Sequence, residues 1–206
     1  MGHDLVRIVN ACVAAAASAV LAAGCASTRL INTWQDPTFS GAPVKSVLVI
    51  GVTRQAGMRR TFEDEFVRQL RAKGVRAVPS YTLVPEDGEV PKERLAAAAT
   101  AAGVQAVLIT RLVKVQWQMQ GYPAAVYGPP YMGWYGFYSS AWVAYYEPVP
   151  VYGYDVVTAE TDLFDAASDV LIWAGTTESF SPRDTKKDTR DFAQVIVGAL
   201  DERKLI

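Results

Sequence analysis

The chain has 206 residues, with 20 basic and 21 acidic side chains, one histidine and two cysteines, and half of its residues are hydrophobic. A net charge of −1 supplies no polycation for phosphate groups, which argues against a nucleic-acid-binding domain. The apolar content is too high for a disordered chain, so the composition indicates one globular domain.

The first 24 residues have the layout of a secretory signal peptide. Arg7 precedes 16 uncharged residues, Ile8 to Ala23, which end in small side chains. This apolar stretch is short for a membrane-spanning helix. The following motif, Ala22-Ala23-Gly24-Cys25, resembles the lipobox of bacterial lipoproteins. The resemblance implies cleavage between Gly24 and Cys25 and attachment of acyl chains such as palmitate to Cys25. With Ala26 next, it also implies sorting to the outer membrane.

Signal removal would change the chemistry open to the mature domain, residues 25–206. It removes His3 and Cys12, so the mature chain keeps no histidine and only Cys25. Catalytic triads that use histidine, histidine-based zinc sites and internal disulfides are thereby excluded. Glycine-rich nucleotide-binding motifs are absent from the sequence as well. We therefore expect no cofactor, no metal site and no enzymatic activity.

The first part of the domain alternates apolar runs with amphipathic segments. A strand is expected at 28–34, and continuous apolar runs at 47–50 and 106–109 are typical of strands buried on both faces. Phe62, Phe66 and Leu70 repeat at helical spacing within an expected helix over 58–73. A strand at 75–78 and a helix over 91–102 complete a β-α-β-α-β unit, whose crossovers favour a parallel sheet.

In the second part of the domain the hydrophobic pattern changes. From Val113 to Gln120 apolar and polar residues alternate, which extends the strand that begins at Ala106. Two further strands, 155–164 and 170–179, flank a turn and are expected to pair antiparallel. Ser181 is the expected start of a C-terminal helix. The predicted fold class is α/β, with a mixed sheet built from a parallel βαβαβ core, an added antiparallel strand pair and a C-terminal helix.

An unusual segment, about 119–152, interrupts these strands. No charged side chain occurs from Val115 to Tyr146, and residues 122–154 hold nine of the ten tyrosines among many glycines and prolines. This composition predicts a loop insertion and excludes one long membrane helix. Its rings form a predicted interaction surface: Tyr127, Tyr131, Trp134, Tyr135, Phe137, Tyr138, Trp142, Tyr145 and Tyr146.

Several uses of this segment stay open. Tyr and Trp rings favour the bilayer interface, stack on sugar rings, or form a surface for self-association. A membrane-spanning hairpin in an oligomeric barrel is a further alternative, which Pro148 and Pro150 disfavour on the return strand. A surface loop without a partner is the remaining interpretation.

Two weaker sites are also considered. Thr158, Glu160 and Asp162 alternate on one strand face, and two carboxylates at such spacing could serve glycoside hydrolysis, although a solvated strand face is the favoured interpretation. The loop 53–57 leaves a parallel strand, where ligands often bind in open α/β sheets. Near it, a weak anion site is predicted from three side chains: Arg54, Arg59 and Arg60.

The mature chain resembles a family of bacterial envelope lipoproteins built on a domain of unknown function. The resemblance is carried by residues 33–37, 47–52, 60–64, 77–81 and 171–175 together with the aromatic segment. The order of strands and helices is distantly similar to that of curli-secretion lipoproteins. These resemblances imply location and fold more than activity.

The sequence thus predicts a non-enzymatic outer-membrane lipoprotein, lipid-anchored and facing the periplasm, that acts as an envelope structural or adaptor component through its aromatic loop. Its expected partners are the membrane, through acylated Cys25, and a cell-wall glycan, an envelope protein or a second copy of the chain. The alternatives are a glycan-binding or glycan-cleaving envelope protein using Glu160 and Asp162, and a subunit of an oligomeric outer-membrane assembly.

Overall fold

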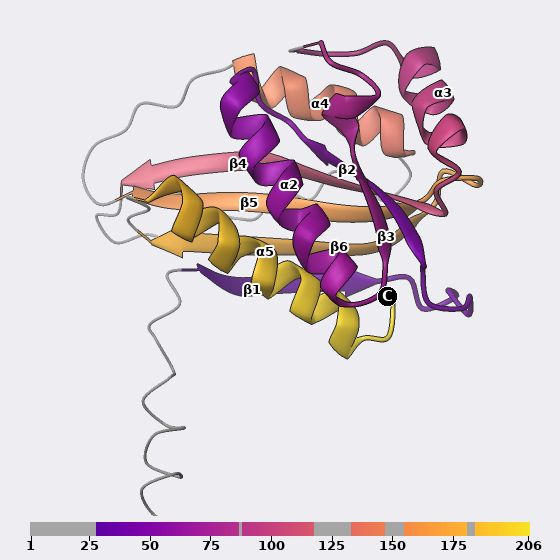
Figure 1. The fold of residues 1–206 in the computed structure, drawn as a ribbon. Coiled ribbons are helices and arrows are strands. Elements are labelled where there is room, and N and C mark those ends of the chain that lie inside the picture. Colours follow the sequence, from indigo (N-terminus) through magenta and orange to yellow (C-terminus); the bar gives the residue numbers. More distant parts are fainter. Residues whose placement is uncertain (1–27, 87, 118–132, 147–154, 181–183) are drawn as a thin grey trace, which may run out of the picture.

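The computed structural model describes residues 28–86, 88–117, 133–146, 155–180 and 184–206. The signal peptide, Cys25 and most of the aromatic segment lie outside these residues. The described chain forms a six-stranded mixed sheet with the strand order β1-β6-β5-β4-β2-β3. Helices cover both faces of this sheet (Figure 1). The α/β class predicted from the sequence is confirmed, with three layers.

The parallel part of the sheet is built as predicted. β2 (Ser46–Gly51) pairs parallel with both β3 (Arg76–Pro79) and β4 (Ala106–Trp117). The crossovers are α2 (Ala56–Ala72) and α3 (Lys92–Ala102), and a short 3-10 turn, η1 (Ser80–Thr82), follows β3. Every residue of β2 is buried, as its continuous apolar run indicated.

The antiparallel part adds three strands. β5 (Asp155–Asp165) lies between β4 and β6 (Leu171–Phe180), and β1 (Thr28–Gln35) pairs with β6 at the edge of the sheet. The C-terminal helix α5 runs from Thr185 to Glu202. Its N-cap is Asp184, whose side chain accepts hydrogen bonds from two backbone amides. The helix therefore begins three residues later than the start predicted at Ser181.

Two cores result because side chains alternate between the two faces of the sheet. On one face α2 and α5 lie side by side, and the rings of Phe62, Phe66 and Phe192 are in mutual contact beneath them. On the other face α3 and α4 (Trp134–Tyr146) cover Leu48, Ile109 and their neighbours. Figure 1 shows α2 and α5 in front of the sheet and α4 behind it.

Helix α4 corrects the prediction of a loop over 119–152, since residues 134–146 are helical. Four rings that were assigned to an interaction surface are buried instead: Trp134, Phe137, Tyr138 and Trp142. Tyr135 is half-buried, whereas Tyr127 and Tyr131, and the side chains of Tyr145 and Tyr146, lie outside the described residues. The described part of the aromatic segment therefore belongs to the core.

Replacing Phe137 tests whether α4 is part of the core. The ring is 4% exposed and its centroid lies 5.6 Å from that of Phe164. Phe137→Ala should lower the free energy of unfolding by about 3–5 kcal/mol because it leaves a cavity. Tyr135→Phe, the control on the same helix, should cost about 1 kcal/mol or less, since it removes one hydroxyl. Urea unfolding followed by far-UV circular dichroism measures both, and equal stabilities would show that α4 is not packed.

Candidate functional site

The strand register brings distant parts of the chain to one end of the sheet. Thr28 of β1 pairs with Ser179 of β6, and Val157 of β5 pairs with the same serine. Two residues beyond Val157 on β5, Asp155 pairs with Trp117 of β4. We call this the anchor end, because Thr28 follows Cys25 by three residues. The aromatic segment leaves the sheet after Trp117 and rejoins it at Asp155, so both of its connections lie at the anchor end.

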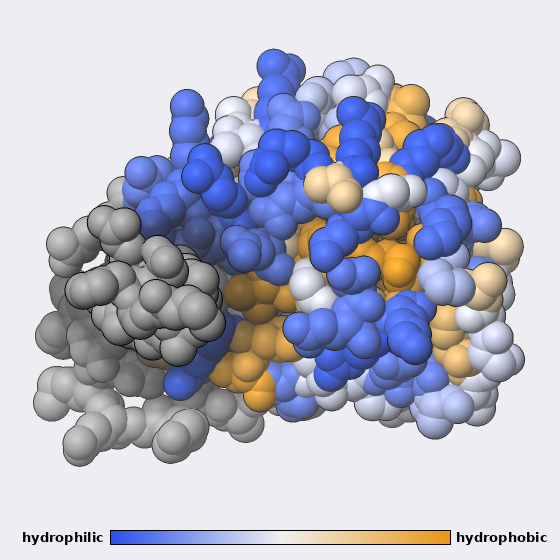
Figure 2. All heavy atoms as spheres, turned by 60° about the horizontal axis from the view of Figure 1, so that its bottom comes forward, coloured by the Kyte–Doolittle hydropathy of each residue, from blue (hydrophilic) through white to orange (hydrophobic). Residues whose placement is uncertain are grey.

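A groove of about 510 Å³ lies near the anchor end on the face covered by α2 and α5. Its floor is formed by strand residues, and its walls come from the first halves of the two helices. The lining includes Leu112, Val157 and Ala159 from the strands, Met58 and Phe62 from α2, and Phe192 from α5. Figure 2, which looks at this side of the molecule, shows hydrophobic surface between hydrophilic areas.

The groove is more apolar than most exposed surface. Met58 is 44% exposed and Leu112 is 42% exposed, although both are large hydrophobic side chains. Asp188 supplies the one charge among the described lining residues, and its carboxylate accepts a hydrogen bond of 2.9 Å from the backbone N–H of Asp184. Thr53 and Gln55 of the loop after β2 also line it, so the predicted ligand position at the end of a parallel strand does coincide with a hollow.

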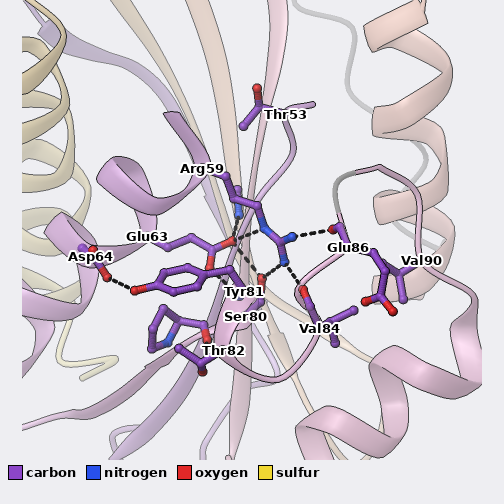
Figure 3. Close-up of polar contacts among 12 residues, drawn as sticks. Thr53, Arg59, Glu63, Asp64, Ser80, Tyr81, Thr82, Val84, Glu86 and Val90 are labelled. Atoms are coloured by element: carbon purple, nitrogen blue, oxygen red, sulfur yellow. Dashed lines mark hydrogen bonds and ion pairs between the residues drawn. The ribbon is translucent and has the colours of Figure 1, made fainter. Parts of the chain in front are cut away.

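The arginines predicted for an anion site are not gathered there. Arg59 is 6% exposed and its guanidinium is occupied on every side (Figure 3). It donates to Glu63 at 3.0 Å, to the Ser80 hydroxyl at 2.8 Å, and to the backbone carbonyls of Val84 and Glu86. The prediction is therefore wrong for Arg59, which is a structural residue. Its spacing of four residues from Glu63 was the sequence signal for an ion pair.

Glu63 extends this hydrogen-bond network from α2 to two other elements. Its carboxylate is fully buried and accepts hydrogen bonds from the amides of Gly51 and Tyr81 as well as from Ser80. It thereby ties α2 to the end of β2 and to η1. The other two arginines are exposed, and Arg60 lies over the ring of Tyr81 at 5.7 Å. Neither Arg54 nor Arg60 lines the groove.

The carboxylates considered for glycan cleavage are also buried. Glu160 is 4% exposed and accepts two hydrogen bonds from Arg111, at 2.8 and 2.6 Å. Arg111 in turn lies 4.5 Å from the ring centroid of Phe137 in α4. The favoured interpretation of this strand face as solvated is therefore wrong: α4 covers it. A hydrolytic carboxylate pair needs an open cleft around the scissile bond, and this arrangement provides none.

Asp162 is a buried acidic residue with an oxygen left unpartnered by the described part of the chain. It is 3% exposed, and its Oδ1 atom has no hydrogen-bond partner among the described residues. Burial raises the pKa of the Asp162 carboxyl well above its usual value of 3.8, and the nearby Glu160 charge raises it further, whereas Arg111 acts in the opposite direction. Burial and the neighbouring Glu160 thus favour the protonated form of Asp162.

The described residues contain neither a membrane-spanning helix nor a metal-binding cluster. No helix among them is both long and apolar enough to cross a bilayer. Within those residues, no group of three or more histidine, cysteine or acidic side chains has the arrangement needed to hold a metal ion.

Arg59 and Arg60 form a matched pair for testing the buried network. Arg59→Met should lower the free energy of unfolding by about 3–5 kcal/mol, because the buried Glu63 carboxylate would lose its counter-charge. Arg60→Met should change it by about 0.5 kcal/mol or less, since Arg60 is exposed. Urea unfolding at neutral pH measures both variants, and comparable losses in the two would contradict the structural role of Arg59.

Asp162 predicts a pH dependence of stability. Because its pKa is raised in the folded state, the folded protein binds the proton more tightly, so the contribution of Asp162 is fully present below pH 3.8 and is lost as pH rises toward the folded-state pKa. Each unit of upward shift corresponds to about 1.4 kcal/mol. Asp162→Asn should therefore become increasingly more stable than the natural protein from pH 4 upward. Urea unfolding across this range tests it, and a pH-independent difference would contradict the shift.

Comparisons with known proteins give structural likeness only. No protein-family model matches the chain, and no curated protein matches it. Among solved structures, a PelC dodecamer from Paraburkholderia phytofirmans is similar at 15% identity with a TM-score of 0.45, covering 82% of this chain and 95% of that one. Lipoprotein GNA1162 from Neisseria meningitidis is similar at 14% identity with a TM-score of 0.38, covering 76% and 98% respectively. At these values no property of either protein is transferred to this chain.

Proposed function

We propose that this chain is a non-enzymatic outer-membrane lipoprotein, anchored through acylated Cys25 and facing the periplasm, that acts as an envelope structural or adaptor component. In this proposal the anchor end of the sheet faces the bilayer. The rest of the domain projects away from the membrane.

The observation that carries the proposal is the shared position of the anchor and the aromatic segment. Thr28 is fixed to β6 by backbone pairing, and its hydroxyl lies 2.8 Å from that of Ser179. Three residues can extend by about 10 Å, so Cys25 stays close to this end of the sheet. Both connections of the aromatic segment, after Trp117 and before Asp155, leave from the same end. A bilayer that holds the acyl chains therefore lies next to the two connections of the aromatic segment, although the start of α4 lies against Asp169 at the opposite end of the sheet.

The chemistry of both parts suits this position. Each acyl methylene that enters the bilayer contributes about 0.8 kcal/mol, so several chains on one cysteine give a lasting anchor. Tyrosine and tryptophan rings with a polar atom at one edge prefer the membrane–water interface. The rings nearest the two connections in sequence, Tyr122, Tyr152 and Tyr154, are the proposed contact surface. Tyr131 is not included, because it precedes Trp134 by three residues and the backbone N–H of Trp134 donates to Asp169 at the opposite end of the sheet.

The glycan-cleaving alternative loses its proposed residues. Glu160 is paired with Arg111 beneath α4, and Asp162 lies on the same covered strand face. Glycan binding without cleavage, contact with an envelope protein and self-association remain alternative partners of the aromatic segment. Co-sedimentation with peptidoglycan separates the first of these from the others.

Site-specific quenching tests the proposed orientation, because Cys25 is the only cysteine in the mature chain. Arg29→Cys places a thiol at the anchor end, and Val170→Cys places one at the opposite end of β6. Arg29 is paired with Glu178, eight residues from Val170 along the chain, so the two positions are about 27 Å apart. With a fluorophore on each thiol, nitroxide lipids in reconstituted vesicles should quench Arg29→Cys strongly and Val170→Cys weakly.

The control is Cys25→Ala in each background, together with labelling by an acyl precursor. It should lose both the acyl label and the difference in quenching. Acyl label that persists in Cys25→Ala would contradict the anchor. Equal quenching at the two positions of the acylated protein would contradict the orientation while leaving the anchor intact.

A further inference from the structure

We infer that the groove between α2 and α5 is an acyl-chain site that receives one of the chains carried by Cys25 of the same molecule when the domain is away from a bilayer. The inference rests on the proposed acylation of Cys25. It adds a binding site within the folded domain and a specific occupant.

The position of the groove provides the first argument. Its lining includes Ser179, the residue whose hydroxyl meets that of Thr28 at 2.8 Å. Cys25 precedes Thr28 by three residues, a reach of about 10 Å. A chain attached to Cys25 therefore begins next to the end of the groove at which Ser179 lies.

The length of the groove provides the second argument. The strands β6, β5, β4 and β2 are consecutive in the sheet. The groove runs across them from Ser179 of β6 to Gly51, the last residue of β2, and Val52. Three interstrand spacings amount to about 14 Å. One acyl chain spans half of a hydrocarbon core, or about 15 Å. The volume of about 510 Å³ lies within the range of small-molecule sites and suits one chain better than two.

The chemistry of the lining selects an uncharged apolar chain. Met58, Leu112 and Val157 offer hydrophobic side chains along the groove. Its one charged lining residue among those described is Asp188, and no lysine or arginine lines it. A free fatty acid would bring a carboxylate toward Asp188 without a cationic partner, which is unfavourable. A chain joined to Cys25 through an ester or amide brings no such charge.

The covalent link to Cys25 favours the protein's own acyl chain over other lipids as the occupant of the groove. A chain on Cys25 is held within reach of the groove at an effective concentration that free lipid in water does not match. The exposed surfaces of Met58 and Leu112 would then be covered in the acylated protein outside a membrane. In a bilayer the same chain returns to the hydrocarbon core, which is as apolar as the groove.

Photocrosslinking of the full acylated protein tests the site. Leu112→Phe, with the phenylalanine supplied as its photoreactive 4-benzoyl derivative, places the probe in the groove, and Leu83→Phe in the same form is the control. The two leucines are 42% and 39% exposed, but only Leu112 lines the groove. The protein is diluted below the critical micelle concentration of its detergent, irradiated, and digested for mass spectrometry. We expect the Leu112 probe to bond to the acyl chain on Cys25 at least about tenfold more often than the Leu83 probe.

A second variant blocks the route into the groove. Val157→Trp, beside Ser179, should abolish the crosslink from the Leu112 probe while far-UV circular dichroism shows a folded domain. The crosslink yield should not depend on protein concentration, since the chain belongs to the same molecule. A yield that rises with concentration would assign the chain to a second copy and overturn the inference.

The remaining outcomes are decisive as well. Equal yields at Leu112 and Leu83, or no acyl crosslink at Leu112 in a protein whose intact mass shows acylation, would overturn the site and leave the lipoprotein proposal standing. Crosslinks to detergent or phospholipid alone would refute the tethered chain as occupant. An intact mass without acyl chains would instead refute the proposed function, and the inference with it.

Discussion

The antiparallel pairing of β1 with β6 is the constraint on which the functional argument depends. This ladder fixes Thr28 opposite Ser179 and so determines where the chain that carries Cys25 meets the folded domain. The pairing is reinforced by the contact between the two hydroxyls and by the Arg29–Glu178 ion pair across the same strands. A shift of one residue would turn Thr28 to the other face of the sheet. The anchor end is therefore specified by backbone hydrogen bonds.

Buried charge is concentrated where secondary-structure elements must be joined. The Arg59–Glu63 pair connects α2 with the end of β2 and the loop after η1. The Arg111–Glu160 pair lies between the sheet and α4, with the Phe137 ring over the guanidinium. Both pairs are desolvated, and such pairs are costly unless their remaining hydrogen bonds are satisfied. Glu63 meets this condition through backbone amides, whereas burial raises the pKa of Asp162 and so favours its uncharged form.

The sequence predicts the parallel core well and the aromatic segment poorly, for physical reasons. Apolar runs at 47–50 and 106–109 have one stable solution, a strand buried on both faces. Helix α4 escaped prediction although its four buried rings repeat at helical spacing, because further aromatic residues between them mask this period and the glycines and prolines around it suggest a loop. Glu160 and Asp162 looked solvated because alternation alone does not reveal which helix covers a face. The groove depends on where two helices diverge, which no local pattern encodes.

An open apolar groove in a well-packed domain needs a physical reason. Fully burying a side chain such as Met58 or Leu112 would contribute about 1.5–3 kcal/mol, and their exposure forgoes much of that. Larger residues at Ala159 or Val157 would fill the space, yet the chain has small ones there. By contrast, the opposite face of the sheet is closed by α4 at the level of Arg111 and Glu160, even at the expense of burying charge. The groove lies on the face of the sheet that is within reach of the acyl chain proposed on Cys25.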